Sequence, residues 1–390
     1  MKMFPESRLS EIERKEYSII VGIPSYNNAD TIEHVVRKVD EGIKNYFDGN
    51  GFIVNADGGS KDGTKEVFMS IETQSDKIAY EYEGVPGKGS AMGSVMELCV
   101  ELKIPIAVFV DSDLRSIDEW WIERLTTPIL EKKASYVTPY YVRHKYDGTI
   151  TNNICYPLTT ALYGKRVRQP IGGDFGLNYE MAKIYAEKPD HWWKSDIGKF
   201  GIDIFMTTVA LNESEYGVYQ AALGAKIHDA KDPGEDLGPM FSQVVGTLFM
   251  LMDYYKENWK EIHEIEDAPI YGEIPIVEPE AVNVNYEKLH EKSVNGVEEF
   301  KKFYTEKLCK EISEYILNCD GRINSKEWVK IIYEFEKLYN STDRKSEVIN
   351  ALIPLYFSRV ADFVVLSKEM DSAQAEILIG NLVEEFRISK

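Results

Sequence analysis

The sequence is poor in cysteine and in long apolar runs. It has four cysteines in 390 residues, and they show neither CxxC nor metal-ligand spacing (Cys99, Cys155, Cys309 and Cys319). The longest apolar stretch, residues 244–252, contains Gly246 and Thr247 and is much shorter than the roughly 20 residues of a membrane helix. Residues 1–15 lack the apolar segment of a signal peptide. We therefore expect reduced thiols in a cytoplasmic protein with no membrane partner.

Positive charge is also scarce. The chain has 45 Lys and Arg against 65 Asp and Glu, which gives a formal net charge of −20. Duplex DNA and anionic membranes are bound through basic surfaces, so we expect no nucleic-acid partner. An acidic protein that binds a small anion needs a metal ion or a local group of Lys and Arg to do so. The length and a hydrophobic content of 44% allow a large core and two or three domains.

Apolar segments alternate with helix-like segments in the first part of the chain. Residues 18–23 (SIIVGI) and 106–110 (IAVFV) are apolar throughout, as in parallel strands covered on both faces. Further predicted strands are 51–56, 79–83 and 136–142, and predicted helices are 30–43, with Asp30 as N-cap, 65–71 and 91–102. This pattern predicts an α/β fold with a doubly wound, mostly parallel sheet, whose ligands gather at the carboxyl ends of the strands.

Four motifs follow predicted strands, in the order Pro24-Ser25-Tyr26-Asn27-Asn28, Asp57-Gly58-Gly59-Ser60, Gly87-Lys88-Gly89 and Asp111-Ser112-Asp113. Gly87 and Gly89 would let the backbone approach a phosphate, and Lys88 would add a point charge, although Gly-Lys-Gly is also an ordinary turn. Asp111 and Asp113 can converge on one Mg²⁺ or Mn²⁺, although such a pair alone is more often two turn caps. The repetition of strand-end motifs favours a ligand site over coincidence.

The second half of the chain differs in character. We expect an N-terminal extension over residues 1–16, a catalytic α/β domain over 17–237, and a mainly helical region over 238–390. A stretch rich in proline and acidic residues near 265–280 is expected to form an extended arm. Residues Trp328, Ile331, Ile332 and Phe335 recur at helical spacing, as in a helical appendage of structural or oligomeric role.

The ordered motifs resemble the GT-A-type glycosyltransferases. Motifs further along narrow the resemblance to the family of glucosyl-3-phosphoglycerate synthase, with glucosylglycerate and mannosylglycerate synthases, over about residues 17–250. The motifs are Pro86-Gly87-Lys88-Gly89, Val110-Asp111-Ser112-Asp113-Leu114, Gln169-Pro170-Ile171-Gly172-Gly173-Asp174, Phe200-Gly201-Ile202-Asp203 and Lys226-Ile227-His228. The C-terminal helices are not covered.

The resemblance implies a retaining hexosyltransferase of compatible-solute synthesis, with UDP- or GDP-hexose as donor and glucose as the expected sugar. It implies a nucleotide site of Pro24, Ser25, Tyr26, Asn28, Asp57, Gly87, Lys88, Gly89, Asp111 and Ser112, in which Asp57 contacts the base. It implies Mg²⁺ or Mn²⁺ bound by Asp113 with His228, and with Asp111 as a further candidate. Asp174 and Asp203 would bind hydroxyls of the donor sugar, so the expected catalytic set is Lys88, Asp113, Asp174 and Asp203. A homodimer is expected from the same resemblance.

The acceptor segment departs from the family pattern. Gly148, Thr149, Thr151 and Asn152 stand where the family has a Gly-Arg-Val-Thr-like segment that receives phosphoglycerate, and Thr149 replaces the arginine. A threonine cannot supply the charge of a guanidinium. Either Arg143, Lys145 or Arg166 compensates, or the acceptor is unphosphorylated glycerate or a glycosylglycerate, so the expected acceptors are 3-phosphoglycerate, glycerate and a glycosylglycerate.

Three alternatives stay open. An inverting transferase that acts on a glycan needs a carboxylate base, and Asp174 or Asp203 could fill that role. A sugar nucleotidyltransferase usually carries a glycine-rich loop with Arg and Lys after the first strand, whereas this strand ends in Pro-Ser-Tyr-Asn-Asn. A non-catalytic nucleotide-sugar binder would keep the fold without turnover.

Overall fold

The computed structural model describes residues 2–13, 15–227 and 237–390. The chain divides into two compact units, each made of several segments: unit 1 comprises residues 1–142, 167–229 and 267–279, and unit 2 comprises residues 143–166, 230–266 and 280–390. The expected boundary after residue 237 lies at the start of helix α9 (Leu237–Tyr254). Two segments cross that boundary: 143–166 belongs to unit 2, and most of the expected arm belongs to unit 1.

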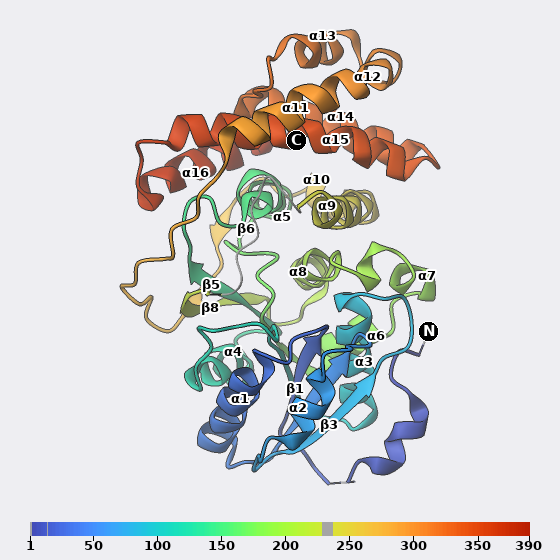
Figure 1. The fold of residues 1–390 in the computed structure, drawn as a ribbon, viewed down its shortest axis with the longest axis vertical. Coiled ribbons are helices and arrows are strands. Elements are labelled where there is room, and N and C mark those ends of the chain that lie inside the picture. Colours follow the sequence, from blue (N-terminus) through green and yellow to red (C-terminus); the bar gives the residue numbers. More distant parts are fainter. Residues whose placement is uncertain (1, 14, 228–236) are drawn as a thin grey trace. The chain divides into compact units, whose positions relative to one another are not determined.

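Unit 1 contains an eight-stranded sheet of order β10-β8-β5-β7-β4-β1-β2-β3 (Figure 1). Strand β7 is antiparallel to its neighbours β4 and β5, and the other pairs are parallel. The predicted α/β class with a mostly parallel sheet is therefore confirmed. The strands are β1 (Ile19–Ser25), β2 (Gly51–Asp57), β3 (Asp76–Glu81), β4 (Ile106–Phe109), β5 (Tyr136–Val142), β7 (Phe175–Asn178), β8 (Val218–Ala225) and β10 (Ile270–Tyr271).

Helices cover both faces of this sheet. Helix α1 (Ile32–Phe47) packs with α4 (Trp120–Leu130), and α3 (Lys88–Glu101) packs with α6 (Tyr179–Ala186). Figure 1 shows these two pairs on opposite sides of the strands. The remaining helices of unit 1 are short or lie at the ends of strands: η1 (Glu6–Glu11), α2 (Thr64–Ser70), α7 (Asp190–Trp193), η3 (Asp196–Gly198) and α8 (Ile202–Glu213).

Two helix starts differ from the prediction. Asp30 is not the N-cap of α1, because the helix begins at Ile32 after Thr31. The Thr31 hydroxyl makes no cap bond and instead donates to the carbonyl of Ser112 at 2.8 Å, which ties this loop to the end of β4. Helix α3 begins at Lys88, earlier than the expected residue 91, so Lys88 stands in its first turn.

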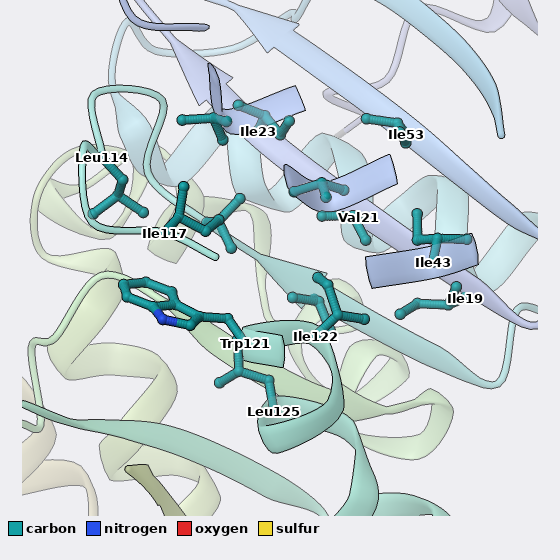
Figure 2. Packing of buried hydrophobic residues seen from close by; sticks show 14 of the residues in the cluster. Ile19, Val21, Ile23, Ile43, Ile53, Leu114, Ile117, Trp121, Ile122 and Leu125 are labelled. Atoms are coloured by element: carbon teal, nitrogen blue, oxygen red, sulfur yellow. The ribbon is translucent and has the colours of Figure 1, made fainter. Parts of the chain in front are cut away.

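The core beneath the Asp111–Asp113 loop holds that loop in place. Leu114 and Ile117 follow the loop and are buried against the α1 and α4 face of the sheet. Figure 2 shows Leu114 and Ile117 near Trp121 of α4 and Ile23 of β1. Each is at most 2% exposed, and burying such side chains stabilises the fold by about 1.5–3 kcal/mol apiece. The strand-end position of the aspartates thus rests on a close-packed support.

Unit 2 is mainly helical. Its long helix α15 (Lys345–Ser367) is apolar and long enough to cross a membrane, but 83% of its most apolar window is buried inside the protein. It packs against α11, α14 and α9, so its apolar surface forms the core of unit 2. The other elements are η2 (Thr151–Cys155), α5 (Tyr156–Tyr163), β6 (Lys165–Arg166), α10 (Lys256–Lys260), α11 (Tyr286–Glu299), α12 (Lys301–Lys307), α13 (Lys310–Asn318), α14 (Ser325–Ser341) and α16 (Ser372–Ser389), with β9 (Glu266–Asp267) at the border between the units.

Candidate nucleotide site at the carboxyl edge of the sheet

Polar side chains of unit 1 gather at one edge of the sheet. Ser25 and Asp57 end β1 and β2, and Asp111 and Lys226 follow β4 and β8. Because β7 is antiparallel to β4, with Phe109 paired to Phe175, Asp174 at its start reaches the same edge. The carboxyl ends of parallel strands are where ligands bind in such sheets, so the topology itself assembles this group.

Asp57 organises the loop that follows β2. Its side chain is buried, and its two carboxylate oxygens accept four hydrogen bonds: from the hydroxyl of Ser25 at 2.8 Å, from the amides of Gly59 at 2.9 Å and Ser60 at 2.7 Å, and from the hydroxyl of Ser60 at 2.6 Å. Four bonds fill the lone-pair sites of a carboxylate. The residue predicted to contact the base therefore shapes its own loop, and in this structure its carboxylate has no lone-pair site left for the base.

The loop after β1 is bonded to the other strand-end loops. The side-chain oxygen of Asn28 accepts from the amide of Tyr26 and from the hydroxyl of Ser112, both at 2.9 Å. The amide of Asn27 donates to the hydroxyl of Ser60 at 2.8 Å. Pro24 lies within β1. These bonds leave the Tyr26 ring 64% exposed on a loop whose backbone is fixed.

Gly87 and Gly89 are required for packing against the segment 197–199. A Cβ atom on Gly89 would lie 1.8 Å from the carbonyl oxygen of Ile197, and one on Gly87 would lie 2.6 Å from that of Gly198. The amide of Gly89 also donates to the carbonyl of Lys199 at 3.1 Å. The expectation that these glycines make room for a phosphate is not supported at the positions of their missing Cβ atoms, which face protein backbone.

Lys88 points into a group of charged side chains that are between 0 and 23% exposed. Its ammonium lies 2.8 Å from Oδ1 of Asp111 and 3.3 Å from Oδ1 of Asp203, and it donates to the carbonyl of Gly173 at 3.4 Å. Asp203 stands in the first turn of α8. Its Oδ1 atom is buried and makes no hydrogen bond with the described residues. The structure thus joins two predicted catalytic residues, Lys88 and Asp203, through one ammonium.

Lys226 also belongs to this group, although it was not among the predicted site residues. Its ammonium lies 2.7 Å from Oδ2 of Asp111 and 3.0 Å from Oδ2 of Asp174, and it donates to the carbonyl of Gly172 at 2.8 Å. The hydroxyl of Tyr141 also donates to Oδ2 of Asp174. The only sequence signal was the place of Lys226 beside His228 in a quoted motif.

The pKa values of this group follow from burial and pairing. Burial alone would raise the pKa of Asp111, but Lys226 and Lys88 lower it far below the usual range. Burial would lower the pKa of Lys88, but the carboxylates of Asp111 and Asp203 raise it. Burial raises the pKa of both Asp174 and Asp203. Asp111 is therefore ionised and neutralised by two lysines.

Asp113 differs from Asp111. It is half-buried, and its carboxylate makes no hydrogen bond or ion pair with residues in the described ranges. A free carboxylate at a strand end suits a hard divalent cation, whereas Asp111 would have to exchange a lysine for one. His228, the third predicted ligand, lies outside the described residues. Within those residues, no group of three or more His, Cys, Asp or Glu side chains could hold a metal ion.

The predicted acceptor residues belong to unit 2. Thr149, Thr151 and Asn152 are at most 4% exposed. The hydroxyl of Thr149 shares a hydrogen bond of 2.6 Å with that of Tyr356, and the amide nitrogen of Asn152 donates to the carbonyl of Lys145 at 3.2 Å. Gly148 has a positive φ of 72°, the backbone conformation that glycine adopts without strain.

The cations expected to compensate for the missing arginine all have partners in unit 2. Arg143 pairs with Asp147 at 2.6 Å, and Arg166 lies 4.0 Å from Glu384. The ammonium of Lys145 donates to the carbonyl of Ser367 at 2.7 Å, at the end of α15.

Comparison with known proteins agrees with this description. Residues 20–183 match the model of glycosyl transferase family 2. Among solved structures, glucosyl-3-phosphoglycerate synthase from Mycobacterium tuberculosis in complex with phosphoglyceric acid is 24% identical with a TM-score of 0.50, covering 60% of this chain and 80% of that one. The same enzyme with Mg²⁺ and uridine-diphosphate is 24% identical, with a TM-score of 0.48 and coverages of 60% and 79%.

No curated protein sequence matches the chain significantly. The identity to the solved structures is low, so they show the fold and no more. The solved structure confirms the predicted GT-A-like fold. The family model confirms the predicted resemblance to glycosyltransferases. The match begins in β1 and ends in α6, and it therefore includes the four strand-end motifs and Asp174. Over residues 20–183, this chain is similar to glycosyl transferase family 2.

Proposed function

We propose that the protein is a metal-dependent glycosyltransferase that moves a hexose, expected to be glucose, from a UDP- or GDP-sugar to a small acceptor. One observation carries the proposal: within the segment that matches the family, an exposed Tyr26, the loop of Asp57, the ammonium of Lys88 and the half-buried carboxylate of Asp113 meet at the carboxyl edge of one sheet. Base, diphosphate and metal each have a chemically suitable residue there.

The donor would lie along the strand ends. Tyr26 offers an exposed ring to the base, and the amides around Asp57 fix the loop beside it. Lys88 would turn from Asp111 to the diphosphate as a point charge. Asp113, with His228 as its expected partner, would bind Mg²⁺ or Mn²⁺, which stabilises charge on the departing diphosphate.

Asp174 and Asp203, the two carboxylates expected to bind hydroxyls of the donor sugar, differ in how many hydrogen bonds they already accept. Asp174 already accepts from the amide of Asp111 at 2.9 Å, from Tyr141 and from Lys226, so few of its lone pairs remain. Oδ1 of Asp203 makes no hydrogen bond with the described residues, although it lies 3.3 Å from the ammonium of Lys88. We therefore assign the contact with sugar hydroxyls to Asp203 first. In the reaction the bond between the anomeric carbon and the diphosphate breaks, the acceptor oxygen forms the new bond to that carbon, and the acceptor proton passes to the departing diphosphate.

The acceptor is the finer part of the proposal. The candidates are 3-phosphoglycerate, glycerate and a glycosylglycerate, and their choice rests on the resemblance of motifs. Arg143 and Lys145 already have partners within unit 2. A phosphate group would have to displace one of these partners, which favours the two acceptors without phosphate.

The test is release of nucleoside diphosphate with Mg²⁺ or Mn²⁺, from UDP- and GDP-glucose and -mannose, each offered the three acceptors. Turnover with one pair identifies donor and acceptor, and NMR of the product shows whether the anomeric configuration is retained. Inversion would favour the glycan-directed alternative. Nucleotide binding without release in the presence of any acceptor would favour a non-catalytic binder.

A further inference from the structure

The charged group at the sheet edge comprises the carboxylates of Asp111, Asp174 and Asp203 and the ammoniums of Lys88 and Lys226. Lys226 is the more enclosed of the two lysines: its side chain is 7% exposed, against 15% for Lys88. Its three close contacts, with Asp111, Asp174 and Gly172, use all three donors of an ammonium. Lys226 has no capacity left for a ligand.

Lys88 is bound more loosely. Only its 2.8 Å contact with Asp111 is short, and those with Asp203 and Gly173 are 3.3 and 3.4 Å. Asp111 presents one oxygen to each lysine. When Lys88 leaves, Asp111 therefore keeps the charge of Lys226, and a largely enclosed carboxylate that keeps a partner avoids the penalty of an unpaired charge.

We infer that Lys226 is a positioning residue that frees Lys88 to bind the donor diphosphate. It does so by neutralising Asp111 and Asp174, which would otherwise both attract Lys88. This inference rests on the proposed function and deepens it, since Lys226 acts on the donor only through Lys88.

The test is calorimetric titration with UDP and with GDP at one fixed Mg²⁺ concentration. In Lys226→Met, Asp111 and Asp174 share Lys88, so the nucleoside diphosphate that the wild type binds is expected to bind at least tenfold more weakly. In Lys226→Met/Asp174→Asn, one of the two carboxylates that compete for Lys88 is gone, so the affinity is expected to recover at least threefold relative to Lys226→Met but to stay below wild type, because Asp111 still holds Lys88. A merely structural role would not predict this recovery.

A double-mutant cycle gives a second readout. Lys88→Met should weaken binding less in the Lys226→Met background than in the wild type, because Lys88 is already held there. Equal affinity of folded Lys226→Met and wild type, no recovery in the double variant, or additive effects would each overturn the inference. If Lys226→Met does not fold, the nucleotide affinity of the double variant is compared with that of Asp174→Asn, which differs from it only at residue 226. A folded wild type that binds neither nucleotide refutes the proposed function itself.

Discussion

The ammonium of Lys88, in the first turn of α3, lies 2.8 Å from Oδ1 of Asp111 at the end of β4. This pair joins a glycine-flanked lysine and a strand-end aspartate that are separate motifs in the sequence. Lys226 bonds the other oxygen of Asp111, so the aspartate is shared by two cations. The different surroundings of Asp111 and Asp113 then give the two carboxylates of one motif different roles.

Lys88→Met is expected to weaken binding of the nucleoside diphosphate about 10- to 100-fold, because a charged hydrogen bond of about 1.5–3 kcal/mol is lost. Calorimetric titration measures the change. The matched control is Lys199→Met, which removes a nearby lysine that is 41% exposed and that, among the described residues, pairs with Asp196 at 3.2 Å. Equal losses in both variants would contradict the assignment.

Asp113→Ala and Asp111→Ala are expected to act on different properties. Asp113→Ala should leave the melting temperature unchanged and weaken Mn²⁺ binding in the presence of UDP or GDP by about tenfold or more. Asp111→Ala leaves two buried ammoniums short of a carboxylate, so the free energy of unfolding should fall by about 3–5 kcal/mol. Electron paramagnetic resonance of Mn²⁺ and thermal unfolding measure the two effects. Unchanged Mn²⁺ binding by Asp113→Ala would defeat the metal assignment.

Gly89→Ala is expected to destabilise unit 1 and reduce nucleotide binding, because its Cβ would lie 1.8 Å from the carbonyl oxygen of Ile197. The cost of overpacking is about 1–3 kcal/mol or more. Gly380→Ala in α16 is the control: nothing lies near its Cβ, and alanine favours a helix by about 1 kcal/mol. Chemical denaturation compares the two. An unchanged free energy of unfolding in Gly89→Ala would contradict this prediction and show that the segment 197–199 can move to accommodate the methyl group.

Glu97→Gln is expected to change how stability depends on pH. The carboxylate of Glu97 accepts from the amides of Met3 at 2.7 Å and Phe4 at 2.8 Å, and burial raises its pKa. A raised pKa in the folded state adds stability below the unfolded pKa of about 4.3, and this contribution is lost as the pH rises through the folded pKa. Glutamine keeps an acceptor without this titration. The difference in unfolding free energy between wild type and variant should therefore shift towards the wild type on acidification, and a constant difference would contradict this.

Strand-end motifs made much of unit 1 predictable. The apolar runs around Ile20 and Val108 fixed parallel strands, and parallel strands bring their carboxyl ends together. Asp57, Lys88 and Asp111 could be placed at one edge for that reason. Contacts between residues far apart in the sequence could not be predicted in this way. Lys226 meets Asp111 because β8 and β4 belong to one sheet.

The packing of Gly87 and Gly89 could not be predicted from the sequence either. A glycine in this motif can serve either a phosphate-binding loop or the close approach of two backbones. The position of the segment 197–199 shows that Gly87 and Gly89 serve the close approach. The burial of Thr149 against Tyr356 depends on α15, far along the chain, in a region that the motifs did not cover.

Calorimetric titration of the wild-type protein with UDP and GDP, with and without Mn²⁺, tests whether a nucleotide-sugar site lies at the carboxyl edge of the unit 1 sheet. We expect one bound nucleoside diphosphate per chain, with binding that depends on Mn²⁺ and is lost in Asp113→Ala. A folded wild-type protein that binds neither nucleotide with Mn²⁺ present would contradict it.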